Sequence, residues 1–390
     1  MTRDGAPEQR VALSTIAREW SHLGVVGFGG PPTHIALLRK KCVQDHEWID
    51  AQEFEDAIAS TNLLPGPAST QLAIFCAWRL RGTLGGIVGG LCFIFPGLVL
   101  IVALSALFLA HHPPIAITGA AVGAGAAVPA VALFAASRLV AQSRQRMGSR
   151  NTELSRWIAY ALAGALVAAL AGSYVVLILI ACGALEVVMR SPGRTSPGPA
   201  HALAPAALLH TVGLAGVGAL CLLAIKVGAL SYGGGFVIIP LMQHDVVTTY
   251  HWMSGAQFLN AVALGQVTPG PVVLTVAVVG YAVAGIGGAL LATVVVFAPS
   301  FLLVLFGATH FSQIRSNHSV TSFLTGASPA VIGAIAGSAI PLGLSLHHLW
   351  QVPLLAAALT WLFVIKRGVV SALLLAGAVG IVLALVGVAV

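Results

Sequence analysis

Two Pro-Gly-Pro triplets, at residues 65–67 and 269–271, each interrupt a segment that is otherwise apolar. Proline lacks a backbone donor and clashes with the preceding helical turn, but it suits the first position of a new helix. We therefore expect a half-helix to end before each triplet and another to begin near Pro67 or Pro271, with free N–H groups facing the break. Helix N-termini attract anions, so each triplet predicts an anion-binding break, with a ligand-free helix kink as the alternative. The predicted binding groups at the two breaks are Asn62, Pro65, Gly66, Pro67, Ser69, Thr70, Gln266, Thr268, Pro269, Gly270 and Pro271, and Gln71 and Thr275 flank the same breaks.

Two glycine-rich segments, residues 27–34 and 231–236, precede the triplets. Glycine leaves bare backbone that a ligand can approach closely, and each segment is again followed by a helix start. His34 can carry a proton or contact the anion, with a hydrogen-bonded packing histidine as the alternative. Lys226 lies inside an apolar run, where a charge is unfavourable by about 2.5–3.5 kcal/mol on insertion scales, so it either faces a cavity and binds the anion or snorkels to the membrane interface. The further predicted binding residues are Gly29, Gly30, His34, Lys226, Gly233, Gly234 and Gly235.

Composition indicates that these segments lie in a lipid bilayer. The chain is 58% hydrophobic and 8% charged, with a mean hydropathy of +0.95, which leaves too little polar surface to cover a soluble protein. Uncharged runs such as Leu84–Ala110 and Gly285–Thr309 are long enough to cross a hydrocarbon core of about 30 Å as helices. Broken helices are tolerated at that depth only where protein or water satisfies the freed backbone groups. The sequence therefore predicts an all-α integral membrane protein whose breaks share a polar cavity, and half-helix N-termini of about +0.5 charge each would suit a tetrahedral dianion there.

The chain contains the same unit twice. Trp48 and Phe54 of the first half recur as Trp252 and Phe258, at the spacing of 204 residues that also relates the two triplets. Farther along, the spacing drifts, and Thr118-Gly119 corresponds to Thr325-Gly326. The predicted organisation is repeat 1 over residues 1–190, a linker rich in Pro, Gly and Ser over 191–205, and repeat 2 over 206–390. Matching Gly/Pro interruptions in two halves point to a transporter binding site at the repeat interface.

Basic residues predict that the two repeats have opposite orientations. In the first half they lie at residues 39–41, 79–81 and 138–156, whereas the connections 243–257, 282–284 and 343–349 of the second half contain no Lys or Arg. By the positive-inside rule the repeats are therefore inverted. Inversion requires an odd number of crossings per half, and Leu203–Ile225 is the expected additional crossing, for a total of about 10–13 membrane segments.

Other classes of function lack the residues that they require. The net charge of +7 is spread over short loops without interleaved aromatics, so no nucleic-acid partner is expected. A membrane-embedded enzyme would need a carboxylate or histidine cluster, and Glu186 stands nearly alone in the apolar runs, so neither an enzyme nor a cofactor is expected. The doublets His111-His112 and His347-His348 lack a third ligand, and the five cysteines form no CxxC pair, so no metal is expected. The charged first twenty residues predict an amphipathic helix at the membrane face rather than a cleaved signal.

The residues around the breaks carry a family resemblance. They read Phe28-Gly29-Gly30-Pro31, His34-Ile35-Ala36-Leu37 and Leu64-Pro65-Gly66-Pro67 in the first half, and Tyr232-Gly233-Gly234-Gly235 and Gly265-Gln266-Val267-Thr268-Pro269-Gly270-Pro271 in the second. With Trp48, Phe54 and their counterparts, they resemble the chromate ion transporter family in its long, two-domain form, over nearly the whole chain. The resemblance implies a multi-pass inner-membrane protein that exports chromate, a sulfate-like oxyanion, from the cytoplasm by alternating access and confers chromate resistance. The sequence departs from the family pattern at Arg39-Lys40-Lys41, where an acidic residue is common, so no coupling role for that acid is implied.

Two alternatives share the need for anion-attracting helix termini. One is a transporter of sulfate or another anion, and the other is a passive anion channel. The sequence also leaves open whether a proton is coupled to transport and whether the protein forms a homodimer.

Overall fold

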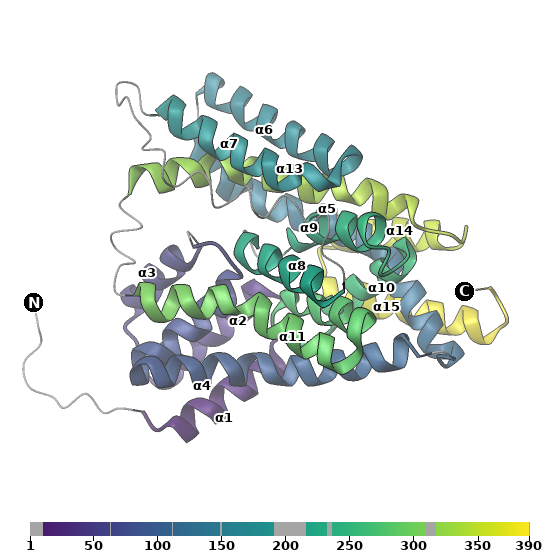
Figure 1. Ribbon diagram of the computed structural model, residues 1–390, viewed down its shortest axis with the longest axis horizontal. Coiled ribbons are helices and arrows are strands. Elements are labelled where there is room, and N and C mark those ends of the chain that lie inside the picture. The colour runs from purple at the N-terminus through teal and green to yellow at the C-terminus, as the bar shows by residue number, and fades with distance from the viewer. Residues whose placement is uncertain are drawn as a thin grey trace, which may run out of the picture.

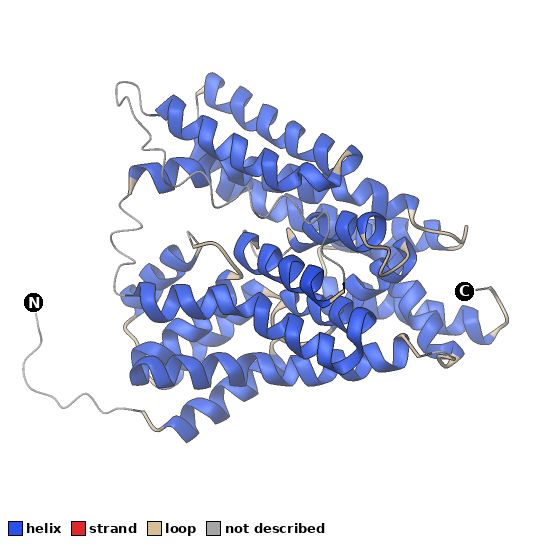
Figure 2. Cartoon of the chain, viewed as in Figure 1, coloured by secondary structure: helices blue, strands red, loops and turns tan. Residues whose placement is uncertain are grey.

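The structure is a computed structural model that describes residues 11–62, 64–110, 112–148, 150–190, 216–231, 236–308 and 317–389. All regular elements in these ranges are helices, and the long ones lie roughly side by side (Figures 1 and 2). Six helices are long and apolar enough to cross a membrane, and three shorter apolar helices accompany them among the described residues. The predicted all-α membrane fold is therefore confirmed.

The helices of the two halves correspond in order. Repeat 1 comprises α1 (Leu13–Val26), α2 (Pro31–Arg39) with the π-helical η1 (Lys40–Asp45), α3 (Ala51–Thr61), α4 (Ala68–Phe108), α5 (Ile115–Met147), α6 (Asn151–Leu170), the short η2 (Gly172–Tyr174) and α7 (Val175–Arg190). Repeat 2 comprises α8 (Val217–Leu230), α9 (Ile238–Gln243) with the π-helical η4 (His244–Thr249), α10 (Gly255–Val267), η5 (Val272–Leu274) leading into α11 (Thr275–Gly307), α13 (His318–Leu344), α14 (Gln351–Leu359) with η7 (Thr360–Val364), and α15 (Val369–Leu385). Even the π-helical segments η1 and η4 recur, so the duplication is a property of the fold.

Each repeat contains a further interruption that the sequence analysis did not predict. Helices α4 and α11 are bent at Arg81-Gly82 and Ala284-Gly285, where the glycines have φ of 63° and 60°. Glycine adopts this left-handed conformation without the steric penalty that other residues meet. Each bend therefore separates a short half-helix, which begins near a Pro-Gly-Pro triplet, from the membrane-length helix that follows it.

Glycine contacts establish the relative direction of the repeats. In α13, Gly333 lies against the backbone of Ala161 and Gly337 against that of Ala165, so α13 and α6 run parallel. Helix α6 follows α5 after a three-residue connection and runs back alongside it. Helices α5 and α13, which are equivalent, therefore run in opposite directions, which confirms the inverted arrangement.

The two repeats exchange their last helices. Helices α6 and α7 of repeat 1 pack on α13 of repeat 2, α14 and α15 of repeat 2 pack on α5 of repeat 1, and α4 packs on α11 between them. Small residues line these contacts, as where Gly123 meets Ala376 and Gly380, and let the helix backbones approach closely. Neither repeat can bury its apolar surface alone, so the pair forms one unit.

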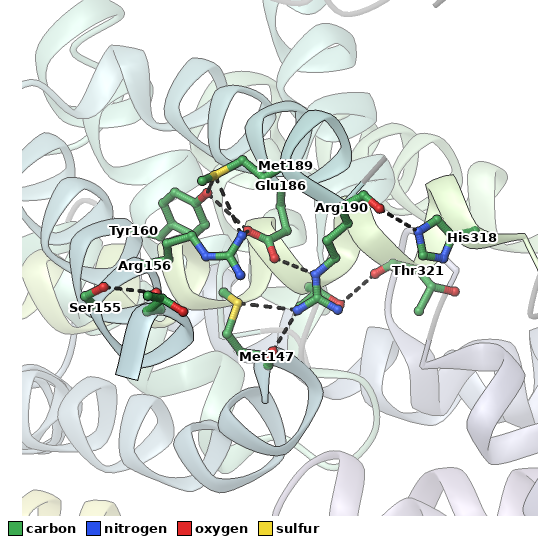
Figure 3. Close-up of polar contacts among 11 residues, drawn as sticks. Met147, Ser155, Arg156, Tyr160, Glu186, Met189, Arg190, His318 and Thr321 are labelled. Atoms are coloured by element: carbon green, nitrogen blue, oxygen red, sulfur yellow. Dashed lines mark hydrogen bonds and ion pairs between the residues drawn. The ribbon is translucent and has the colours of Figure 1, made fainter. Parts of the chain in front are cut away.

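A buried charge network holds the α6–α7 hairpin in place, as Figure 3 shows. The fully buried Glu186 accepts hydrogen bonds from Arg190 Nε at 2.5 Å and from the hydroxyl of Tyr160 at 3.2 Å, and it pairs with Arg156 at 3.3 Å. Arg190 also donates to the carbonyl oxygen of Met147 at the end of α5, at 2.7 Å. These partners of the carboxylate lie on α6 and α7 themselves. No group of three or more metal-ligating side chains occurs among the described residues.

The described part of the expected crossing Leu203–Ile225 belongs to the apolar helix α8, which corresponds to α1. Whether it adds a crossing stays a prediction, because residues 203–215 lie outside the described ranges. The correspondence of α1 and α8 is difficult to see in the sequence because α1 carries charges and α8 is mostly apolar. In the structure Glu19 of α1 is paired with Lys41 at 2.9 Å. Helix α1 buries Trp20 against α4, with the indole N–H donating to the carbonyl oxygen of Ala73 at 2.8 Å. The place of α1 at the membrane face stays a prediction.

Residues 191–215 lie outside the described ranges. The predicted linker, residues 191–205, is part of this stretch and is therefore not described. The boundaries of the two repeats at residues 190 and 206 therefore stay predictions. The total of 10–13 membrane segments also stays a prediction, because it depends on how the short helices around the breaks are counted.

Candidate functional site

The first Pro-Gly-Pro triplet forms the expected break between α3 and α4. Gly66 has φ of 121°, and a Cβ added there would come within 2.6 Å of the amide nitrogen of Gln71 and 3.0 Å of the hydroxyl of Ser300. The same amide nitrogen donates to the carbonyl oxygen of Pro65 at 2.7 Å. Helix α4 begins at Ala68 directly after the triplet, so its first N–H groups face the break.

The second triplet forms the matching break between α10 and α11. Gly270 has φ of 95°, and its N–H donates to the carbonyl oxygen of Gly27 at 3.0 Å. A Cβ on Gly270 would find its nearest neighbours at 3.8–3.9 Å, among them the carbonyl oxygen of Phe93 and the backbone of Gly97. The second break is thus held against repeat 1, while the first break meets Ser300 of repeat 2. The two breaks lie at the interface between the repeats, as predicted.

The first glycine-rich segment is tied to the same place by His34. This side chain is 1% exposed, with Nε2 2.9 Å from the carbonyl oxygen of Gly27 and Nδ1 3.2 Å from the hydroxyl of Ser69. A carbonyl oxygen can only accept, so Nε2 carries a proton, whereas the hydroxyl of Ser69 can either donate to a bare Nδ1 or accept from a protonated one. Gly29 and Gly30 adopt φ of 101° and 77° just before α2. Gly233, Gly234 and Gly235 lie outside the described residues.

Polar atoms without a partner gather at the breaks. Among the described residues, five of the six buried side-chain atoms that lack a hydrogen-bond partner flank the breaks or the glycine-rich segments: Thr70 Oγ1, Gln71 Oε1, Ser231 Oγ, Gln266 Nε2 and Ser300 Oγ. An unpartnered buried polar atom is unfavourable by about 1–3 kcal/mol unless a ligand satisfies it. Sequence reasoning missed Ser231 and Ser300. The signal for Ser300 was its position directly after Pro299, which corresponds to Pro96-Gly97 in repeat 1.

Two further predicted residues, Asn62 and Thr268, lie at the ends of the helices that precede the breaks. Asn62 follows the last turn of α3 and lines a small cavity of about 20 Å³ with Ser143, Arg146 and Ser328. Thr268 donates its hydroxyl to the carbonyl oxygen of Leu264 at 2.6 Å, so that hydroxyl caps α10.

Lys226 does not lie unpaired at the breaks. Its ammonium nitrogen is 2.5 Å from Oδ2 of Asp245 in η4, and the two side chains are 7% and 6% exposed. The equivalent elements of repeat 1 are joined by Glu19 of α1 and Lys41 of η1, with the charges reversed. The pair therefore ties the first helix of each repeat to its π-helical segment, and the predicted role of Lys226 in anion binding stays untested.

An α-helical membrane protein with paired broken helices meeting between inverted repeats has the architecture of a secondary transporter. The chromate transporter family model matches residues 14–187 and 218–382, one stretch in each repeat, and the chain belongs to that family. It is 29% identical over 361 residues to a probable chromate transport protein of Synechococcus elongatus, covering 90% of both chains. It is 31% identical over 337 residues to a chromate transport protein of Cupriavidus metallidurans, covering 85% of this chain and 82% of that one. No solved structure matches the chain.

The two central glycines should respond differently to alanine. Gly66→Ala forces a left-handed residue and displaces the Gln71 amide and Ser300, whereas Gly270→Ala meets the conformational penalty alone. We expect Gly66→Ala to lower chromate uptake into everted vesicles at least tenfold and Gly270→Ala to lower it less, at equal membrane protein level. Normal uptake by Gly66→Ala would show that the first break is not part of the site.

Proposed function

We propose that the protein exports chromate or a similar oxyanion from the cytoplasm across the inner membrane, by alternating access at the two Pro-Gly-Pro breaks, and thereby confers chromate resistance. The named relatives support chromate as the first substrate to test, because two of those that the chain covers most fully are called chromate transport proteins. The convergence of the breaks and the unpartnered polar atoms beside them support the location of the site.

One observation carries the mechanism: the equivalent halves are packed differently. Helix α10 lies against α5, α15 and α11, whereas its counterpart α3 packs chiefly on α4. Asn260 of α10 is buried while the equivalent Asp56 of α3 is exposed, and Pro269 is buried while Pro65 is exposed. The apolar core follows the same division, since α8–α11 share the main core and α1–α3 form a separate one with the start of α4.

Equivalent segments that pack differently, such as α3 and α10, are expected in a transporter whose site is closed on one side of the membrane and open on the other. Exchange of the two packings would close the α3 side and open the α10 side. Arg39 pairs with Glu55 of α3 and Arg79 pairs with Glu53 of α3, and the positive-inside rule assigns the side with these basic residues to the cytoplasm. The described state is then open to the compartment from which an exporter takes its substrate.

Chromate uptake into everted vesicles tests the proposal, because their cytoplasmic face meets the assay buffer. We expect saturable uptake above that of vesicles without the protein, and acceleration of labelled chromate efflux by unlabelled chromate on the opposite side. Imposing a proton gradient tests for a coupled proton, and sulfate as a competitor tests the breadth of the substrate class. Absence of uptake would refute chromate transport, and uptake without counterflow would favour a passive channel.

A further inference from the structure

The polar groups beside Gly66 include an acceptor as well as donors. The side-chain amide of Gln71 and the hydroxyl of Ser300 both border the position of Gly66. The carbonyl oxygen of Pro65 can only accept, so the atom of Gln71 that lies 2.7 Å from it must be the NH₂ group. This fixes the orientation of the amide and leaves Oε1 as its free atom.

Beside Gly66, Oε1 of Gln71 and the hydroxyl oxygen of Ser300 are buried and without a partner, and so is the hydroxyl oxygen of Thr70, the residue before Gln71 in α4. All three residues have no exposed surface. The hydroxyls can donate to an oxyanion, but the amide oxygen can only accept. A fully deprotonated oxyanion has no hydrogen to offer, so it would leave Oε1 unsatisfied and repel it.

The charges near Gly66 also differ from those that a dianion would need. His34 supplies no obligatory charge, because a neutral imidazole already satisfies both the carbonyl oxygen of Gly27 and the hydroxyl of Ser69. Lys226, two residues from Gly228 on α8, is paired with Asp245. Among the described groups that we identify around Gly66, positive charge comes from the N-terminus of α4, which amounts to about +0.5. That charge suits one negative charge better than two.

We propose that Gln71 and Ser300 beside Gly66 bind the oxyanion in its singly protonated form, with the hydroxyl of the anion donating to Gln71 Oε1. The inference rests on the proposed function, of which it specifies the substrate. It distinguishes chromate from sulfate, because the second dissociation of chromic acid falls near neutral pH, whereas sulfate is fully deprotonated there. Each transported anion would carry one proton with it.

Wild-type vesicles provide the first test. With equal pH on both sides, the half-saturation concentration of total chromate should rise about tenfold per pH unit above the second dissociation of the anion, as the binding form becomes scarce. Sulfate does not titrate in this range, so its inhibition constant should not follow. A half-saturation value that does not change with pH, or an equal shift for sulfate, would overturn the inference while leaving chromate transport intact. Absence of chromate uptake at every pH would instead refute the proposed function.

Two variants separate the acceptor from a donor. Gln71→Met removes the acceptor at similar volume, together with the hydrogen bond from the amide to the carbonyl oxygen of Pro65. It should raise the half-saturation concentration about two- to tenfold at acidic pH and make its pH dependence shallower, and the shallower pH dependence is the change that reports the acceptor. Ser300→Ala removes a donor, so it should raise the value by a similar factor at every pH and leave the slope unchanged. An unchanged slope in Gln71→Met would exclude Gln71 as the proton acceptor, and membrane protein level is measured for both variants so that misfolding is recognised.

Discussion

A disulfide between Gly125→Cys and Leu259→Cys should stop transport completely and reversibly. A Cβ added to Gly125 of α5 would lie 3.6 Å from Cβ of Leu259 of α10, within the range of about 3.5–4.5 Å found in disulfides. The neighbouring Asn260 side chain must turn aside to admit the new Cβ. In the proposed alternating access α10 leaves α5 when the closed side opens, so the bond would hold the protein in the described state. Uptake into everted vesicles after mild oxidation, with and without a reductant, measures the effect.

The controls for this lock come from the chain itself. The five native cysteines, all free in the structure, are replaced first, and Leu259→Cys alone should transport normally after oxidation. The equivalent pair in the other half is Glu55→Cys with Ile332→Cys, which should form a bond only as the α3 side closes, and so more readily during turnover. Full transport by protein that is crosslinked between α5 and α10 would contradict alternating access of these helices.

The breaks and the duplication could be predicted from sequence because both depend on local chemistry. Proline and glycine act on the backbone where they stand, so Pro65–Pro67 and Pro269–Pro271 end helices whatever surrounds them. The inverted topology followed from Lys and Arg in short loops, which is again a local signal. For His34 the sequence left two alternatives open, a group that meets the anion or a hydrogen-bonded packing histidine, and the structure shows hydrogen bonds to Gly27 and Ser69.

Partners distant in the sequence could not be predicted. Lys226 was expected to meet an anion or the interface, but its partner is Asp245, 19 residues away, and a single charge in an apolar run does not identify its counter-ion. Ser300 lies more than 200 residues from Gly66 along the chain, so its place at the first break depends on how α11 crosses α4. The different packing of α3 and α10 belongs to one conformational state. Because the two segments have equivalent sequences, the sequence does not predict which of them is packed more closely.

Breaking the pair of Lys226 and Asp245 should cost more stability than any other single change to the charges around the first helices. Both side chains are at least nine-tenths buried, and removing one partner from such a pair leaves an uncompensated charge, which destabilises by about 3–5 kcal/mol. Lys226→Met and Asp245→Leu should each lower the membrane protein level and the thermal midpoint in detergent. The double variant should recover most of both, since no charge then remains buried.

Repeat 1 supplies the matched control and the test of a charge swap. There the acid, Glu19, lies on the first helix and the base, Lys41, on the π-helical segment, with side chains 10% and 24% exposed. Lys41→Met should therefore destabilise less, because water still reaches the carboxylate. Repeat 1 also tolerates the reversed polarity, so Lys226→Asp with Asp245→Lys should be more stable than either single change. If Lys226→Met instead reaches the membrane at the normal level but raises the half-saturation concentration for chromate, the lysine binds the oxyanion and the pair is not structural. If Lys226→Met with Asp245→Leu instead restores the protein level and leaves the half-saturation concentration unchanged, the pair is structural. A lysine that binds the anion would still be missing in this double variant, so the half-saturation concentration would rise.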